Sequence, residues 1–304
     1  MTVYLARRAL QAVAVVLLVT LIVFGLVRLA PGGVTTAVLG SGSAHQQFLA
    51  QYLTWLGRVL SGNLGRSARL NESVGALLAA SLPRTLVLTG VSTLIALLVA
   101  VPVGLLQAVR RSSTVDHVLR GLTYLCYGMP PFVLGSVLIL YFAVDWHFFG
   151  AEGPQAAGIG GVLADPRDLT LPVLTLALVT IAIFARYMRS SALDSLDQEY
   201  VQAARARGGG ERRVIVSHVL RNSLVPVVTL IGLSLPQIVG GALVVEILFN
   251  FQGMGWQIWQ AAVNHDVPVT LGFTLVIGVA AAVGSLLADI GYAILDPRVR
   301  ISRP

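Results

Sequence analysis

Long apolar windows without formally charged side chains recur along the chain. A helix that crosses the hydrocarbon core of a bilayer, about 30 Å thick, needs roughly 20 apolar residues. Six windows approach or exceed this length, at 9–27, 85–109, 121–144, 169–185, 222–245 and 267–288. We therefore expect an all-α polytopic membrane protein of about six transmembrane helices. Met129-Pro130-Pro131 lies inside the third window, and we expect it to kink or break that helix because proline lacks a backbone N–H.

The polar stretches between the windows suggest an order of segments along the chain. A first segment, 1–30, holds the N-terminus and the first span, and 299–304 form a tail. Between them lie an outer segment, 31–83, and a region with the other five spans, 84–298, which includes a polar loop at 190–222. Within the outer segment, the helical spacing of four side chains predicts an amphipathic helix on the membrane face. These side chains are Tyr52, Trp55, Leu56 and Val59.

The distribution of arginine sets the expected orientation. All 21 basic residues are arginine, and the chain is 56% hydrophobic and only 12% charged, whereas a soluble domain is about 25% charged. If both termini face the cytoplasm, fifteen arginines lie inside and six outside, which is the bias of the positive-inside rule. We therefore place both termini in the cytoplasm. The net charge of +7 then follows from membrane topology, and we expect no nucleic-acid partner.

The cytoplasmic loop reads as two short helices joined by glycines. Ser195 and Gln198 have the spacing of a capping box, which predicts a helix that starts near Leu196. The run 208–210 is all glycine and stops this helix, because glycine adopts left-handed backbone angles at little cost. A second helix is expected to run to about Arg221. Exposed short helices that carry alanine suit docking into a groove on another protein.

The same loop carries a family resemblance. The stretch Glu199-Tyr-Val-Gln-Ala-Ala-Arg-Ala-Arg-Gly208, followed by Ser217-His-Val-Leu-Arg-Asn-Ser-Leu-Val-Pro226, resembles the EAA loop of ABC importer permeases in its peptide/nickel variant. Gln202 stands where the motif has an acidic residue, and Leu220-Arg221 stands for the usual Leu-Pro ending. Further stretches resemble other motifs of the family in the same order, at 7–32, 51–67, 82–86, 246–255 and 287–298.

The resemblance implies a function and a set of partners. It implies the pore-forming subunit of an ATP-driven importer in the inner (cytoplasmic) membrane, paired with a second homologous permease, two ABC ATPase subunits and an extracytoplasmic binding protein. The loop would enter a cleft of the ATPase. ATP and Mg would bind to the ATPase subunits, and this chain would hold no cofactor. The implied loop contacts are Glu199, Gln202, Ala203, Ala204, Gly208, Gly209, Glu211, His218, Arg221 and Asn222.

Several alternatives stay open at this level. The resemblance implies dipeptides or oligopeptides as cargo, yet nickel chelates or glutathione-like molecules fit the same architecture. An alternative function of another class is a secondary transporter driven by an ion gradient. Such a transporter would require carboxylates or broken-helix ion sites near the bilayer centre. The sequence offers none there.

Two acidic residues near span ends are candidate gate or subunit contacts, because a charge at membrane depth is costly. These are Glu246 and Asp289. The five histidines are scattered, so we expect no metal site. The chain also lacks the G-x-x-x-x-G-K-[ST] phosphate loop, the H-E-x-x-H zinc pair and the G-x-S-x-G nucleophile turn, and we expect a transport subunit rather than an enzyme.

Overall fold

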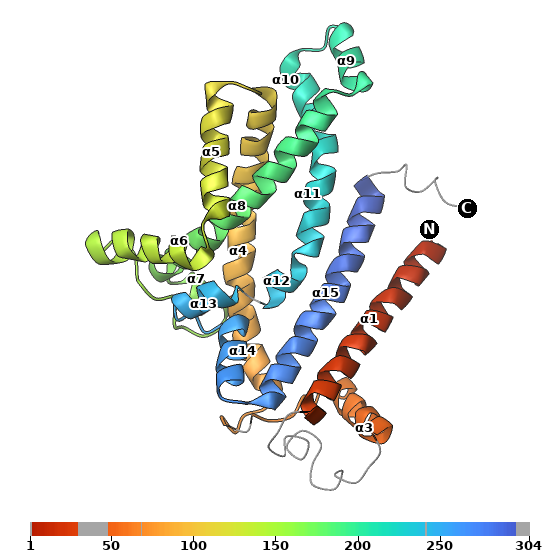
Figure 1. Ribbon diagram of the computed structural model, residues 1–304, viewed down its shortest axis with the longest axis vertical. Helices are drawn as coiled ribbons and strands as arrows, with labels where there is room; N and C mark the ends of the chain where they lie inside the picture. Colours follow the sequence, from red (N-terminus) through yellow and green to blue (C-terminus); the bar gives the residue numbers. More distant parts are fainter. Residues whose placement is uncertain (1, 30–47, 68, 241, 296–304) are drawn as a thin grey trace. The chain divides into compact units, whose positions relative to one another are not determined.

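The computed structural model describes residues 2–29, 48–67, 69–240 and 242–295, and this part of the chain consists of helices joined by turns and loops (Figure 1). It contains no β-sheet, and its one isolated bridge is antiparallel, between Arg66 and Ser73. The helices are α1 (Thr2–Leu29), α3 (Phe48–Leu60), α4 (Val74–Val109), α5 (Thr114–Gly128), α6 (Pro131–Leu138), the π-helix η2 (Ile139–Asp145), α7 (Gly158–Leu163), α8 (Pro166–Leu196), α9 (Glu199–Ala206), α10 (Glu211–Val214), the π-helix η3 (Ile215–Leu220), α11 (Arg221–Leu233), α12 (Leu235–Gly240), α13 (Leu243–Leu248), α14 (Met254–Val263) and α15 (Val267–Leu295). The predicted tail, 299–304, lies outside the described residues, as does much of the first half of segment 31–83.

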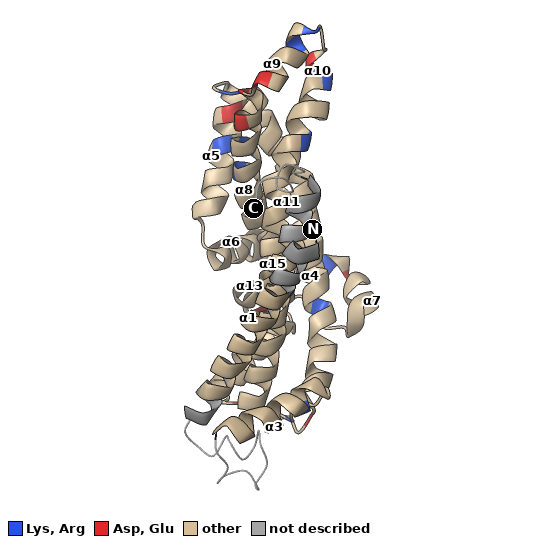
Figure 2. Ribbon diagram, turned by 90° about the vertical axis from the view of Figure 1, so that its right-hand side faces the viewer, with Lys and Arg blue, Asp and Glu red and all other residues tan. Residues whose placement is uncertain are grey.

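Four helical stretches are long and apolar enough to cross a bilayer, namely Val74–Val109, Pro166–Leu196, Glu211–Leu233 and Val267–Ala288. A fifth candidate is the pair Thr114–Gly128 and Pro131–Asp145, whose axes meet at 105°. The predicted proline break is thus confirmed, since α6 begins at Pro131 with Pro130 as its N-cap. The described residues hold four or five candidate spans rather than six, because the apolar stretch described in α1 is only Val13–Ile22. Figure 2 shows few charged residues along the long helices.

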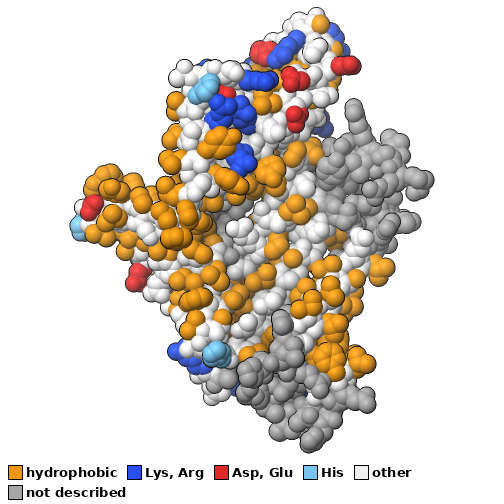
Figure 3. Space-filling model, viewed as in Figure 1, with side chains coloured by type: hydrophobic (Ala, Val, Ile, Leu, Met, Phe, Trp, Pro, Cys, Tyr) orange, Lys and Arg blue, Asp and Glu red, His pale blue; other side chains and the backbone are white. Residues whose placement is uncertain are grey.

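The outer surfaces of these helices are apolar. On the face shown in Figure 3, hydrophobic side chains cover α5 and α6. Leu122 and Leu125 of α5 are 54% and 60% exposed. Large exposed apolar patches are rare on soluble monomers, so these surfaces fit contact with lipid or with other membrane-embedded chains.

The chain forms two compact units. Unit 1 comprises Met1–Thr89, Glu152–Leu169 and Leu235–Leu286, and unit 2 comprises Gly90–Ala151, Thr170–Ser234 and Leu287–Pro304. Three long helices, α4, α8 and α15, contribute residues to both units.

Within unit 1, the predicted amphipathic helix packs against α1. Phe24 of α1 and Trp55 of α3 are buried together, and the Tyr52 hydroxyl lies 2.9 Å from Thr20 Oγ1. The apolar face that the spacing predicted is therefore used for contact with the first helix. A second cluster joins the start of α4 to α14 and α15, through Val74, Met254 and Phe273 among others.

Within unit 2, a stripe of small residues brings α4 close to α8. Ala96, Ala100, Gly104 and Ala108 follow one another at intervals of four residues, and all are buried. A Cβ on Gly104 would lie 2.6 Å from the Ala185 carbonyl oxygen. Small residues let helix backbones approach closely in membrane proteins, where the gain comes from van der Waals packing.

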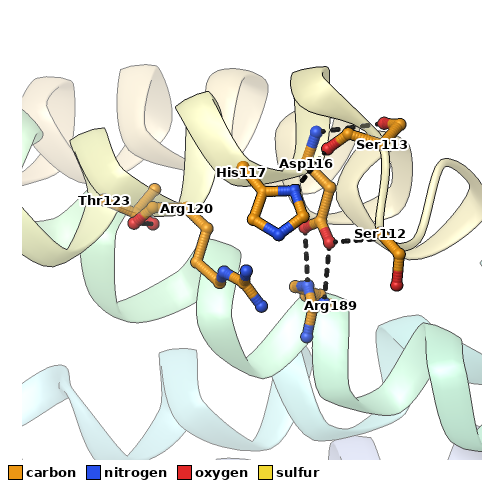
Figure 4. Close-up of polar contacts among 7 residues, drawn as sticks. All are labelled: Ser112, Ser113, Asp116, His117, Arg120, Thr123 and Arg189. Atoms are coloured by element: carbon orange, nitrogen blue, oxygen red, sulfur yellow. Dashed lines mark hydrogen bonds and ion pairs between the residues drawn. The ribbon is translucent and has the colours of Figure 1, made fainter.

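An ion pair ties α5 to α8 in the same unit (Figure 4). Asp116 is 1% exposed and accepts hydrogen bonds from Arg189 Nε at 3.2 Å and Nη2 at 3.1 Å. It also accepts from the Ser112 N–H, while the Ser113 hydroxyl caps the N-terminus of α5. Asp116 is buried while Arg189 is partly exposed, so loss of Arg189 would leave a buried carboxylate uncompensated, and this contact favours the packing of α5 on α8.

Candidate functional site

The predicted docking loop is an ordered helical hairpin at one end of unit 2, between α8 and α11. The prediction that its first helix starts near Leu196 is wrong, because α8 itself continues through Leu196. Ser195 therefore belongs to α8, and its hydroxyl accepts a hydrogen bond from Ser223 at 3.2 Å. Gln198 is the N-cap residue of α9 but makes no side-chain cap bond. Its amide donates instead to the Asp194 carbonyl.

The second helix of the loop also differs from the prediction. It does not end at Arg221, where the backbone angles are helical (φ −57°, ψ −45°). The helical stretch Glu211–Leu233 passes through this point, because glycine and proline are both absent from the first ten residues that follow Gly210. α10 is thus the beginning of the same continuous helical stretch that contains α11, so a displacement of α10 can be passed along this stretch.

One face of the hairpin is buried against the rest of unit 2. Val201, Ala204, Val214 and Val219 are at most 8% exposed and cluster with residues of α4 and α8. Ala204, one of the predicted docking residues, is therefore an anchor of the hairpin. Its neighbours Gln202 and Ala203 are exposed on the opposite side of α9 from this buried cluster.

The glycine run makes the turn between the two helices. Gly208 has a φ of +78°, a left-handed conformation that favours glycine. Gly209 has no room for a side chain, since a Cβ there would lie 2.8 Å from the Ala204 carbonyl oxygen. The predicted glycine turn is confirmed, and the two glycines are required for different reasons.

Substitutions in the turn should distinguish the requirement for a positive φ at Gly208 from the lack of space at Gly209. Gly209→Val is expected to lower the free energy of unfolding by about 2 kcal/mol, because the new side chain overpacks against α9. Gly208→Asn should be tolerated, because asparagine adopts left-handed angles more readily than most residues. Thermal unfolding of the purified chain in detergent measures both effects. Gly210→Ala is the matched control, since a Cβ at Gly210 meets nothing within 4 Å, and equal losses in all three variants would contradict this account.

Polar contacts hold the hairpin together on its outer side. The Arg205 guanidinium donates to both carboxylate oxygens of Glu211, at 2.6 and 3.1 Å. Hydrogen bonding to Glu211 raises the pKa of Arg205. Asn222 Nδ2 donates to the Tyr200 hydroxyl at 2.8 Å, which joins the start of α11 to α9. The Arg205–Glu211 pair is exposed, so its contribution to stability is small.

The structure brings the predicted loop residues to one end of unit 2 but gives them different environments. Ala204 is buried, and Gly209 is half-buried. The remaining residues are exposed: Glu199, Gln202, Ala203, Gly208, Glu211, His218, Arg221 and Asn222.

The two acidic candidates lie elsewhere. Glu246 belongs to α13 in unit 1 and is fully buried, with its carboxylate accepting hydrogen bonds from the Thr85 hydroxyl at 2.8 Å and the Trp256 N–H at 3.0 Å. The α13 helix is outside the candidate spans, and burial raises the pKa of Glu246 to about 7. Asp289 lies in α15, and its side chain is outside the described part of the chain.

Sequence reasoning missed two polar contacts within the units. Thr85, the partner of Glu246, has no local sequence signal, since 161 residues separate them. The Asp116–Arg189 pair was also missed, although the spacing of Ser113 and Asp116 is that of a helix start.

The fold and the hairpin together define a class of protein. The helices are those of a multi-pass membrane protein, and its most distinctive polar element is a helical hairpin between two candidate spans. The model of the family described as "binding-protein-dependent transport system inner membrane component" matches residues 100–301. The chain belongs to this family of inner-membrane transport components.

Relatives extend the similarity over nearly the whole chain. The chain is 36% identical to the oligopeptide transport system permease protein AppB of Bacillus subtilis, with 98% of this chain and 99% of the relative covered. It is also 36% identical to a putative peptide permease protein of Brucella suis, with the same shares covered. It is 30% identical to the dipeptide transport system permease protein DppB of Escherichia coli, and 98% of each chain is covered.

Proposed function

We propose that the chain is the pore-forming permease subunit of an ATP-driven importer of dipeptides or oligopeptides. One observation carries the mechanism: α9 is anchored by Val201 and Ala204 and presents Gln202 and Ala203 outward. A rigid helix with a small exposed face can dock into a cleft of a motor subunit. The cargo is supported by the names of relatives at 30–36% identity, which are peptide permeases.

The proposed topology has six spans with both termini in the cytoplasm. α1 is 28 residues long, about 42 Å at 1.5 Å per residue, which is enough to cross a bilayer as the sixth span. Fifteen of 21 arginines then lie inside, in agreement with the positive-inside rule. The α9–α10 hairpin is cytoplasmic in this arrangement, where it can reach an ATPase.

The proposed partners follow from the family description, which names dependence on a binding protein. A second homologous permease would complete the pore, two ABC ATPase subunits would bind ATP and Mg, and an extracytoplasmic binding protein would deliver the cargo. Closure of the ATPases would move α9, and continuous helix from α10 into α11 would carry this movement into the membrane. Such coupling requires an element with two states that nucleotide biases.

Ala203, an exposed alanine of α9, provides the test. Ala203→Trp should reduce peptide uptake, and ATP hydrolysis stimulated by the binding protein, at least tenfold, because the indole blocks docking while the hairpin core is untouched. Uptake of a labelled dipeptide in cells and ATPase activity of the reconstituted complex measure the effect. Membrane levels of the variant should match the wild type.

Two control variants sharpen this test. Ala203→Ser keeps the surface small and should retain uptake. Ala204→Trp should lower the amount of folded protein, because Ala204 is buried and overpacking is destabilising. Normal uptake by Ala203→Trp, or uptake by this chain without ATPase subunits, would contradict the proposed function and favour a secondary transporter.

A further inference from the structure

A pocket of about 390 Å³ opens between α5 and α8 in unit 2. Gln107 of α4, Arg120 of α5, and Arg186 and Arg189 of α8 contribute to its lining. Nothing in the proposed transport mechanism uses these side chains.

The pocket carries excess positive charge. It combines three guanidinium groups with one nearby carboxylate, Asp116, which accepts two hydrogen bonds from Arg189 and attracts Arg120 without a hydrogen bond. Arg186 lies over the ring of Tyr127 at 4.2 Å from the centroid, a contact that leaves its charge uncompensated. Arg120 forms no ion pair among the described residues, and Figure 4 shows its side chain extending from α5 toward α8. Guanidinium groups match the oxygen atoms of phosphates and carboxylates.

A buried amide adds an unused donor to this lining. Gln107 is 1% exposed, and its Nε2 has no hydrogen-bond partner among the described residues. Buried polar groups in folded proteins are almost always paired, and an unpaired one requires an explanation. An amide N–H₂ group beside uncompensated guanidinium groups is a set of donors, so the matching ligand is an acceptor with negative charge.

The position of the pocket along α8 favours phosphate over other oxyanions. Arg186 follows Pro166, the first residue of α8, by 20 residues, which is about 30 Å of helix and about the thickness of the hydrocarbon core. The side chains of Tyr124 and Tyr187 are 55% and 48% exposed at this level, as in the aromatic belts where lipid head groups begin. Basic pockets between helices on the cytoplasmic side bind anionic head groups.

We propose that this pocket binds a phosphate oxyanion, supplied either by the head group of an anionic phospholipid or by free phosphate. Gln107, Arg120 and Arg186 donate to its oxygens, and Arg189 is held in place by Asp116. The assignment of the pocket to the cytoplasmic leaflet rests on the proposed topology, whereas binding itself can be measured without transport.

Native mass spectrometry of the purified full chain in detergent tests the proposal. The probes are dioctanoyl phosphatidylglycerol, dioctanoyl phosphatidylcholine, inorganic phosphate and a dipeptide. One phosphatidylglycerol should bind saturably and more tightly than phosphatidylcholine, and the double variant Arg120→Gln/Arg186→Gln should raise its Kd at least tenfold. The control Arg110→Gln/Arg111→Gln removes the same charge from two exposed residues outside the pocket, and should change the Kd less than twofold.

A second variant keeps the proposal testable if the arginine variants misfold. Gln107→Met has nearly the same shape and no donor, so it should weaken phosphatidylglycerol binding at least threefold without a change in charge. Binding of inorganic phosphate with the same dependence on Arg120 and Arg186, and no gain from the lipid, would assign the site to free phosphate. Equal losses in both double variants, binding of neither phosphate probe, or binding of the dipeptide alone would overturn the proposal.

Discussion

Gly104→Val is expected to lower the free energy of unfolding by about 3 kcal/mol, at the upper end of the range for overpacked cores. Even a Cβ at this position would lie 2.6 Å from the Ala185 carbonyl oxygen and 2.7 Å from Met188 Cβ. Both atoms belong to α8, which cannot give way independently of α4, because the two helices are in contact along the stripe from Ala100 to Ala108. The variant should therefore separate the helices in unit 2 rather than adjust one side chain.

Gly90→Ala is the matched control for this prediction. Gly90 lies on the same helix, but a Cβ there meets nothing within 4 Å, and glycine to alanine in a helix interior stabilises by about 0.4–1 kcal/mol where no strain follows. Thermal unfolding midpoints in detergent should thus move in opposite directions for the two variants. A Gly104→Val chain with the wild-type midpoint would show that α4 and α8 are less tightly packed than the structure has them.

The parts of the fold that could be predicted are those with a local physical cause. Proline at 130 and 131 removes consecutive N–H donors, so the break in the third window follows from the sequence alone. The turn at Gly208 requires a positive φ, and glycine is the residue that adopts it most readily. The apolar face of α3 could also be predicted, because its helical spacing is a local pattern. The sequence did not show that α1 is its packing partner.

The parts that could not be predicted depend on contacts between distant residues. Hydropathy ended the fourth window before Arg186, yet α8 continues to Leu196, because a charge interrupts an apolar pattern without interrupting a helix. Arg189 is stabilised in that extension by Asp116 of α5, and no periodicity within α8 indicates this. The burial of Ala204, which divides the predicted docking residues into anchor and surface, likewise depends on α4.

The sequence identified Glu246 as a candidate functional residue, and only the structure shows which groups surround it. The carboxylate accepts hydrogen bonds from Thr85 of α4 and from the Trp256 N–H in the first turn of α14. Gly253 and Gly255 are needed there, because a Cβ on either would lie 2.6 or 3.2 Å from Glu246 Oε2. The stretch 246–255, which ends in Gly253-Met254-Gly255, therefore forms part of the surroundings of the Glu246 carboxylate within unit 1.

This environment predicts that unit 1 loses stability as the pH rises. Burial raises the pKa of Glu246 from 4.5 to about 7 in the folded chain, so between these values the folded state holds a proton that the unfolded state releases. The stabilisation is fully present below pH 4.5, is lost as the pH rises through about 7, and amounts to about 3 kcal/mol for this difference in pKa. Unfolding midpoints of the detergent-purified chain between pH 4.5 and 8.5 should fall accordingly.

The Glu246→Gln variant tests whether ionisation of Glu246, and not of another group, causes the pH dependence of stability. The amide keeps the size of the side chain and cannot ionise, so the fall in midpoint between pH 4.5 and 8.5 should be largely abolished. Glu72→Gln is the control, because Glu72 is an exposed carboxylate in the same unit and its replacement should leave the pH dependence unchanged. If Glu246→Gln kept the wild-type pH dependence, another group would be responsible, and the carboxylate of Glu246 would have to reach water or a cation in the folded chain.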